Sequence, residues 1–399
     1  MTFKSIHPFP ARMAPSIVLD ELRNEKQKLT IVDPMVGSGT SIVAARLQGH
    51  EAIGFDVDPL AVLIARTWAA DIIESEVRRA SENALKSARK FVGDICQGNA
   101  YPVEADDETR KFLRFWFDPY SRRQLTALCR AIEGCSNRRL RDVLWCGLSR
   151  MVITKSDGVS LAMDVSHSRP HKVYTRSPRR PFEQFPEEIE RIVRSAPFKT
   201  STGGFPRARV FRGDARKMWL PSESVDLVIT SPPYLNAIDY LRGHRLALAW
   251  MGHQVSSLRR VRSQAIGSEN ALCSPAMIPI LPRLSGYSKN TQPRLRGMLL
   301  KYAADMFEAL SEVKRILKPG GRLLLVIGNS TTHGTFINTS GLIQALAGSL
   351  GLKLTSARSR VLPDSRRYLP PPNATDAGSS LRKRMRTEVV LKFERHHET

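Results

Sequence analysis

The segment Ser231-Pro232-Pro233-Tyr234 has the residue types that chemistry on an amino group requires. An exocyclic amino group of a base is a poor nucleophile, because its lone pair is delocalised into the ring. The Ser231 hydroxyl and the Pro232 carbonyl could accept the two amino protons, which would favour a pyramidal nitrogen. The prolines stiffen the turn, and Tyr234 could stack on a base that has left a duplex. The alternative interpretation is a rigid turn after a core strand.

A second segment, DPMVGSGTS at 33–41, could hold a ligand with its backbone. Gly37 and Gly39 follow an apolar run, so that the chain can approach a ligand closely, and the next helix offers free N–H groups. The spacing lacks the third glycine of a dinucleotide fingerprint, since Ile42 stands there, and it lacks the lysine of a phosphate-binding loop. The segment alone therefore indicates only a nucleotide-like ligand.

Acidic residues end three predicted strands, at Asp33, Asp56 and Asp214. An acid at the position of Asp56 can accept hydrogen bonds from both ribose hydroxyls, or it can simply cap the next helix. Asp214 could accept from an adenine amino group. Three acids suit a neutral nucleoside better than a phosphate chain. The predicted cofactor is therefore an adenosine that carries an amino acid.

A parallel sheet is needed to position these residues. Apolar runs at 29–33 and 51–56, with a helix between them, predict a βαβ unit. A further helix is expected at 58–70, with Asp58 as its N-cap and Pro59 at its first position. Other strands are predicted at 209–214, 225–231, 322–329, 353–361 and 387–393, and helices at 302–317 and 340–351. The pattern indicates an α/β fold with about seven strands.

Two stretches interrupt this pattern. Residues 1–74 are predicted to form the cofactor-binding first part of one α/β domain, and residues 206–399 its catalytic second part. Between them, 75–205 form a mainly helical insertion with a basic end, a candidate for target recognition. A second insertion is expected at about 255–298. Neither stretch resembles a sheet layer.

The chain is strongly basic, with 61 Lys and Arg against 38 Asp and Glu, a net charge of +23. Such an excess favours a polyanionic partner, although a basic proteome or a membrane surface could also explain it, and charge does not separate DNA from RNA. Three basic clusters could contact phosphates, or could be solvated faces or arms. They are Arg169, Lys172, Arg176, Arg179 and Arg180 near Tyr174; Arg259, Arg260 and Arg262; and Arg382, Lys383, Arg384 and Arg386.

The five cysteines, Cys96, Cys129, Cys135, Cys146 and Cys273, form no C-x-x-C pair. They are expected to be reduced thiols, and no metal site is expected. The first residues lack the apolar core of a signal peptide, and no apolar run reaches membrane-spanning length. These features predict a cytoplasmic protein, associated with the nucleoid when bound to DNA.

DPMVGSGTS together with TSPPY resembles the amino-group DNA methyltransferases, which make N4-methylcytosine or N6-methyladenine. The resemblance implies a Rossmann-like class I methyltransferase fold, S-adenosylmethionine as cofactor, and double-stranded DNA whose target base is flipped out. It implies cofactor contacts from Asp33, Gly37, Ser38, Gly39 and Thr40, and a catalytic role for Ser231, Pro232, Pro233 and Tyr234.

Three further stretches are similar to the same family. Residues 6–12 (IHPFPAR) resemble the element beside the methionine part of the cofactor, so His7 joins the predicted cofactor site, although a lone histidine is more often structural. Residues 235–250 and 366–372 resemble related bacterial methylases. Within the former, Tyr240, His244 and Arg245 are candidates to line the site.

The serine at the first position of the catalytic motif is commoner in the enzymes that modify cytosine N4, and the resemblance therefore favours that base. Two features depart from the family: many of those enzymes carry the catalytic motif first, and the insertion at 75–205 matches no known recognition domain. The alternatives are an N6-adenine DNA methyltransferase, an RNA base methyltransferase and a non-catalytic DNA-binding protein. A cognate restriction endonuclease is a candidate partner.

Overall fold

The computed structural model describes residues 4–9, 12–155, 157–199, 204–235, 239–267, 293–332, 335–362 and 387–396. Several features of the sequence analysis lie outside these ranges. They are Cys273, most of the 255–298 insertion, the 366–372 stretch and the basic cluster at 382–386, together with parts of the stretches 6–12 and 235–250.

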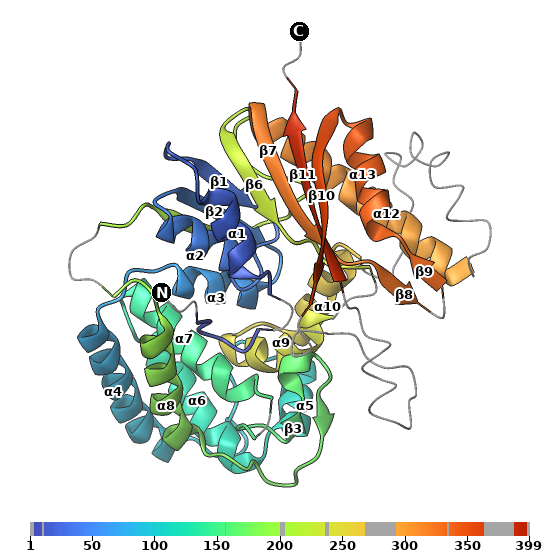
Figure 1. Cartoon of the computed structure of the whole chain (residues 1–399). Helices are drawn as coiled ribbons and strands as arrows, with labels where there is room; N and C mark the ends of the chain where they lie inside the picture. The colour runs from blue at the N-terminus through green and yellow to red at the C-terminus, as the bar shows by residue number, and fades with distance from the viewer. Residues whose placement is uncertain are drawn as a thin grey trace.

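Seven strands form one sheet in the order β10-β11-β7-β6-β1-β2-β5. Their bounds are Thr30–Asp33 (β1), Glu51–Asp56 (β2), Ala208–Arg212 (β5), Val225–Thr230 (β6), Leu317–Ile327 (β7), Leu352–Val361 (β10) and Thr387–Arg395 (β11). Neighbours from β5 to β7 pair in parallel, whereas β11 runs antiparallel to both β7 and β10. The expected α/β, Rossmann-like fold with about seven strands is confirmed (Figure 1).

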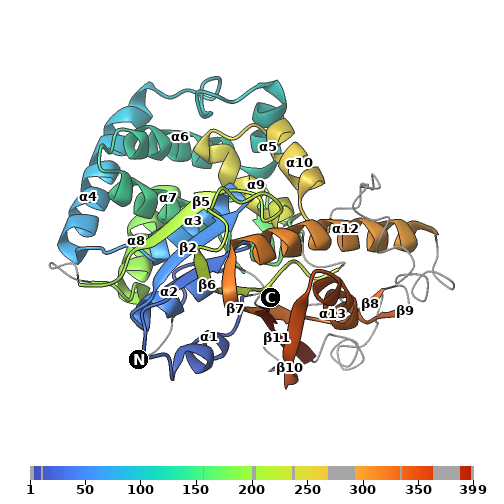
Figure 2. The same ribbon diagram turned by 90° about the horizontal axis from the view of Figure 1, so that it is seen from above.

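Helices cover both faces of the sheet. Successive side chains of a strand point to opposite faces, and on the central strands the side chains on both faces are apolar and need cover. On β7, Leu324 and Val326 face a core shared with α1 (Pro15–Leu22), α2 (Thr40–Leu47) and α3 (Pro59–Trp68). Leu323 and Leu325 face a second core, which α12 (Pro293–Ile316) and α13 (Thr339–Ser349) complete. Figure 2 shows α1 and α12 on opposite sides of the sheet.

Local signals in the sequence set several of these boundaries. The Asp58 side chain accepts a hydrogen bond from the Leu60 N–H at 2.9 Å, and Pro59 is the first residue of α3, as expected. The start of β7 was predicted too late, since the strand begins at Leu317 rather than Arg322. Its pairing with β6 shifts across this start, and Gly320 adopts a φ of +75° there, so that 318–321 form a bulge at the start of the strand.

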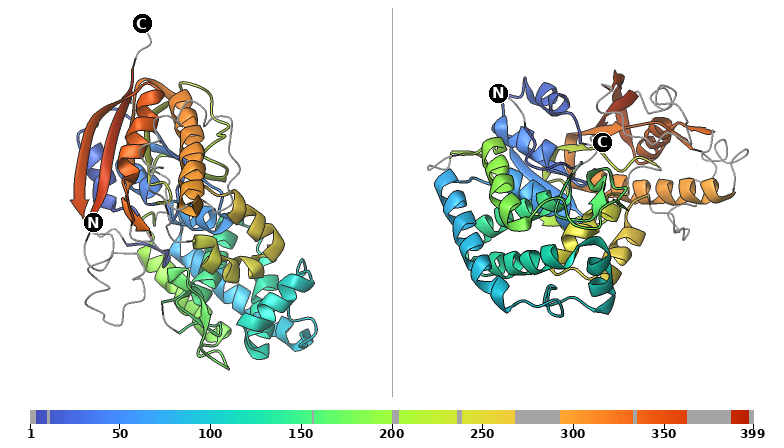
Figure 3. Two further views of the ribbon diagram at one scale, coloured as in Figure 1. Left: turned by 90° about the vertical axis from the view of Figure 1, so that its right-hand side faces the viewer. Right: turned by 90° about the horizontal axis from the view of Figure 1, so that it is seen from below.

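A helical body lies between β2 and β5 in the sequence and beyond one end of the sheet in space (Figures 1 and 3). Its helices are α4 (Glu74–Phe91), α5 (Asp107–Trp116), α6 (Pro119–Glu133), α7 (Arg138–Val152) and α8 (Pro181–Ser195), with short 3-10 turns η1 (Val92–Asp94) and η2 (Val165–His167). The body also contains a small hairpin that the sequence did not indicate, made of β3 (Ala162–Met163) and β4 (His171–Lys172). Its buried side chains belong to the same core as α1 to α3.

The remaining elements follow β6. They are α9 (Tyr240–Leu248), η3 (Ala249–Met251) and α10 (Val255–Gln264), and the small pair β8 (Ser330–Thr332) and β9 (Thr335–Ile337). Among the described helices, none combines the length and the apolar character needed to cross a membrane. The described residues also contain no cluster of three His, Cys, Asp or Glu side chains that could hold a metal ion.

Candidate active site

A cavity of about 760 Å³ lies at the carboxyl ends of β1, β2, β5 and β6, where open α/β sheets place their ligands. The N-terminal segment and α10 complete its walls. Nine of the predicted site residues line it: Asp33, Gly37, Ser38, Thr40, Asp56, Asp214, Ser231, Pro233 and Tyr234. The fold therefore brings together two motifs that lie far apart in the sequence.

The loop between β1 and α2 depends on two glycines in the left-handed region. Gly37 has a φ of +50° and Gly39 a φ of +94°. A Cβ atom on Gly39 would lie 2.9 Å from the Cα of Ala65 in α3, so only glycine allows this loop to pack on that helix. Gly39 does not itself line the cavity; it fixes the path of the residues that do.

Asp33 connects this loop to residues 231–234 after β6, the predicted catalytic turn. Its carboxylate accepts from the Met35 N–H at 3.0 Å, from the Thr230 hydroxyl at 2.8 Å and from the Ser41 hydroxyl. Thr230 directly precedes Ser231, so the bond connects the end of β1 with the end of β6. Burial raises the pKa of Asp33 to about 6, against the lowering effect of these hydrogen bonds.

Asp56 lies in the wall of the cavity and is held by backbone donors. It accepts from the N–H groups of Gly37 and Asp58, each at 2.9 Å. Burial, followed by the neighbouring charge of Asp58, raises the pKa of Asp56 to about 7. Asp58 itself is buried and paired with Nδ1 of His244. Within the described residues, Asp56 forms no ion pair with a Lys, Arg or His side chain. Hydrogen-bond donors of a ligand would therefore stabilise its charged form.

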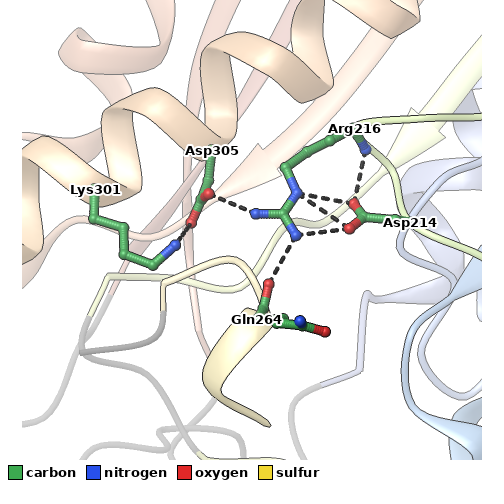
Figure 4. A network of polar contacts seen from close by, with 5 residues as sticks. All are labelled: Asp214, Arg216, Gln264, Lys301 and Asp305. Carbon is green, nitrogen blue, oxygen red and sulfur yellow. Dashed lines mark hydrogen bonds and ion pairs between the residues drawn. The ribbon is translucent and has the colours of Figure 1, made fainter. Parts of the chain in front are cut away.

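Asp214 has a different environment, which Figure 4 shows. Both of its carboxylate oxygens accept from the Arg216 guanidinium, the shortest contact being 2.6 Å. Arg216 also donates to Asp305 of α12 at 2.6 Å and to the Gln264 carbonyl at the end of α10 at 2.7 Å. Lys301 completes the network by pairing with Asp305 at 2.9 Å. Asp214 therefore connects β5 to α10 and α12.

The catalytic turn is anchored through its tyrosine. Ser231, Pro233 and Tyr234 line the cavity, whereas Pro232 is not among the lining residues. The Tyr234 hydroxyl lies 3.5 Å from Oε2 of Glu388 on β11, and Arg360 of β10 pairs with the same carboxylate. Burial, and then the charge of Glu388, raises the pKa of Tyr234 well above its usual range, so the phenol stays neutral.

The N-terminal segment covers the glycine loop with an aromatic side chain. Phe9 stacks on Tyr240 with ring centroids 5.4 Å apart and lies 5.2 Å from the His244 ring. A Cβ atom on Gly37 would lie 3.5 Å from Cε1 of Phe9. Tyr240 lines the cavity, as the sequence suggested, whereas His244 and Arg245 are not among its lining residues. His7 is not brought to this cavity either; it is buried and bonded to the Ser149 hydroxyl at 3.0 Å.

The two described basic clusters differ in position. Arg259, Arg260 and Arg262 on α10 line the cavity, where Arg259 pairs with Glu108 at 2.7 Å and Arg262 with Asp239 at 2.8 Å. The cluster at 169–180 lies away from the cavity, on and after the β3–β4 hairpin. There Lys172 lies over the Phe115 ring and Arg180 over the Tyr120 ring.

Arg216 is the site residue that sequence reasoning missed. It lies two positions after Asp214, and an acid and an arginine at that spacing on a strand end can pair locally. Nothing local indicates its bond to Asp305, which is 89 positions away. The pairing of Arg216 with Asp305 can be found only when the position of α12 relative to the end of β5 is known.

Comparisons with known proteins give the following relatives. No family model matches the chain. The Type II methyltransferase M.MvaI of Kocuria varians is 22% identical over 96% of this chain and 89% of its own length. The Type II methyltransferase M.BsoBI of Geobacillus stearothermophilus is 26% identical, over 58% of this chain and 49% of its own length. M.MjaII of Methanocaldococcus jannaschii, also named a Type II methyltransferase, is 22% identical over 85% of this chain and 74% of its own length.

Two solved structures are similar at a lower level. A TehB-like SAM-dependent methyltransferase from Corynebacterium glutamicum is 10% identical with a TM-score of 0.31, covering 96% of this chain and 86% of its own. A SAM-dependent methyltransferase from Methanosarcina mazei is 10% identical with a TM-score of 0.34, and the match covers 97% of this chain and 100% of that chain. The names of the sequence relatives confirm the resemblance that the two motifs indicated.

Proposed function

We propose that this chain, a homologue of Type II methyltransferases, transfers the methyl group of S-adenosylmethionine to an exocyclic amino group of a base in DNA. N4 of cytosine is the preferred target, because the catalytic motif begins with serine. One observation carries the proposal: Ser231 and Tyr234 line the same cavity as the β1–α2 loop and Asp56. A methyl donor and an acceptor base must meet in one such space.

The cavity fits the proposed cofactor in size and in its polar groups. A volume of about 760 Å³ lies within the range of small-molecule sites. Asp56 would accept from the ribose hydroxyls, and the glycine loop under Phe9 would face the amino-acid part. Asp214 would accept from the adenine amino group with lone pairs that Arg216 leaves available. When bound, the cofactor supplies an electrophilic methyl group on a sulfonium.

The chain's own residues would then orient the base and carry its protons. The Ser231 hydroxyl and the Pro232 carbonyl accept from the amino group, whose lone pair is thereby directed at the methyl carbon. Tyr234, neutral and anchored to β11, stacks on the flipped base. The excess proton leaves to water after transfer. None of the residues that line the described cavity is a cysteine, and the proposed transfer is direct, without a covalent enzyme intermediate.

DNA is proposed as the substrate because arginines of α10 lie at the cavity. Such side chains contact phosphates and position a duplex. The helical body at 75–205 stays the proposed target-recognition part, and a cognate endonuclease a proposed partner. The second candidate function is N6-adenine methylation, which the order of the motifs favours, since the cofactor motif precedes the catalytic one.

The test is to incubate the purified protein with S-adenosylmethionine and unmethylated genomic DNA, digest the product to nucleosides and analyse them by mass spectrometry. N4-methylcytosine is the expected product. N6-methyladenine would overturn the choice of base and leave the methyl-transfer chemistry in place. No methylated nucleoside, from protein that binds the cofactor tightly, would contradict DNA as substrate, and RNA would then be assayed in the same way.

A further inference from the structure

A second cavity, of about 380 Å³, lies beside the first and shares Phe9 and Arg12 with it. Its walls come from the N-terminal segment, the end of α7, η2 and the end of α8. The remaining lining residues are Lys4, Ser5, His7, Pro8, Arg150, Lys155, Ser166, His167 and Ser195. Four of the lining side chains are Lys or Arg, and none is Asp or Glu.

The charge of this cavity stays positive after its neighbours are considered. Arg150 is matched by Glu188, which lies 2.7 Å away and does not line the cavity. The ends of α7 and α8 each bring about half a negative charge. Lys4 and Lys155 bring two further positive charges, so the helix ends offset only part of the positive charge. Asp164 lies 3.3 Å from the exposed His167.

Two buried polar atoms on the cavity's lining residues have no hydrogen-bond partner within the described part of the chain. They are Oγ of Ser166 and Nδ1 of His7. The Ser149 hydroxyl donates to the Cys146 carbonyl, so His7 must donate to Ser149 from Nε2, and its Nδ1 keeps a lone pair while the ring is neutral. A buried polar atom without a partner is costly, which favours a ligand or water that would satisfy both.

The pKa of His7 is also affected by the positive charge around it. Burial lowers the pKa of His7 well below its usual value, and the charges of Arg150 and Arg12 lower it further. A bound anion would offset these positive charges and would let His7 take up a proton on Nδ1 and donate from it.

We propose that this second cavity, defined by Lys4, Arg12, Lys155 and Ser166, is a binding site for a phosphate group. The inference rests on the proposed function for its choice of source, the backbone of the substrate DNA next to the flipped nucleotide. A flipped base enters the first cavity while its sugar and phosphates stay at the entrance. Because Arg12 lines both cavities, a phosphate held there lies beside the site of methyl transfer.

The first test measures the affinity of the full chain for a short duplex over a range of salt concentrations. Lys155→Gln should weaken binding several-fold and lower the slope of log affinity against log salt by about 0.9, the value for one lost phosphate contact. Ser166→Ala should weaken binding up to about tenfold without changing the slope, because it removes a hydrogen bond but no charge. Lys26→Gln is the matched control, since Lys26 is exposed in the loop before β1, at the amino end of that strand, whereas the first cavity lies at its carboxyl end.

The second test identifies the source of the phosphate. Duplexes that carry one uncharged methylphosphonate linkage, placed at successive positions around the target base, should reveal one position that weakens wild-type binding but not that of Lys155→Gln. Inorganic phosphate is titrated in parallel, with the melting temperature as readout. If phosphate stabilises the wild type but not Lys155→Gln, and the salt slopes are equal, the site binds phosphate but not that of DNA.

The inference is wrong if both variants match the wild type in DNA affinity, salt slope and response to inorganic phosphate. This failure is distinct from failure of the proposed function, which would show as a wild-type protein that binds the cofactor but methylates no DNA. Both variants are compared with the wild type for cofactor affinity and melting temperature, which should be unchanged because neither residue lines the first cavity.

Discussion

Asp56 is the last residue of β2 and Asp214 lies two residues after the end of the neighbouring parallel strand β5, yet their environments are opposite. Among the described residues, Asp56 accepts hydrogen bonds from backbone N–H groups alone and has another carboxylate, Asp58, beside it. Asp214 is bound on both oxygens by a guanidinium. The comparison teaches that topology places an acid at a site, whereas its non-local neighbours decide how much of its negative charge is already paired within the protein.

The largest expected effect comes from breaking the scaffold side of this comparison. Arg216→Met leaves Asp214 without its cation and leaves the buried Asp305 paired with Lys301 alone. Removal of one partner from a fully buried ion pair costs about 3–5 kcal/mol, and the expected loss is near the lower end of that range because Arg216 and Asp214 are partly exposed. Urea unfolding should show a loss of this order. Lys217→Met, at the exposed neighbouring position, is the control and should change stability little. Equal stability of the two variants would show that the network does not stabilise the fold.

Substitution in the predicted catalytic turn should affect methyl transfer rather than cofactor binding, the role proposed for the two acids. Ser231→Ala removes the proposed acceptor for an amino proton, and we expect methyl transfer to slow about 100-fold, as when one positioned hydrogen-bonding group is lost. Cofactor affinity should change less than twofold. Single-turnover rates and cofactor titration measure the two quantities. Equal rates in the variant and the wild type would exclude Ser231 as the acceptor.

Substitution of each acid by asparagine should change stability in opposite directions, beginning with a gain for Asp56→Asn. The pKa of Asp56 is raised to about 7 in the folded chain, so folding binds its proton more tightly and the charge costs stability as pH rises from about 4 to 7. Removal of the charge should stabilise the variant by about 4 kcal/mol at pH 8, at about 1.4 kcal/mol per pKa unit. Its amide has one accepting oxygen for the two backbone N–H groups, which costs about 1–3 kcal/mol, so we expect a smaller net gain at pH 8 that is lost near pH 4.

Its matched variant is Asp214→Asn, which should lose stability at pH 8, because Arg216 then lacks its charged partner. Thermal unfolding of both variants at pH 8 and pH 5 provides the measurement. If both variants shift stability in the same direction, the two carboxylates do not differ as the structure indicates.

The smallest expected effect is a pH dependence of cofactor binding. If ionised Asp56 accepts the ribose hydroxyls, affinity should fall as pH drops below about 7, by less than tenfold per pH unit. Calorimetric titration of S-adenosylmethionine between pH 6 and 8 measures this. The Asp56→Asn variant should bind more weakly and with a flatter profile; an equally steep profile would assign the titration to another group, such as Asp33.

Local signals predicted the fold well and the site only in outline. The cap at Asp58, the glycine loop and the alternation of apolar runs are all local, and each was found where expected. The bulge before Arg322 and the β3–β4 hairpin were missed, since both depend on contacts with distant segments. The partners of His7 and Arg216 were not predictable for the same reason. The roles of the site residues and the domain boundaries stay predictions.

The position of β11 in the sheet also affects how the site is made during synthesis. This strand, the last of the described strands in sequence, lies between β7 and β10 rather than at an edge. It carries Glu388, the partner of Tyr234, which is 154 positions earlier. At 5–20 residues per second, roughly 8–30 s separate the translation of the two residues. On the ribosome, the glycine loop can thus form well before the tyrosine of the catalytic turn is anchored.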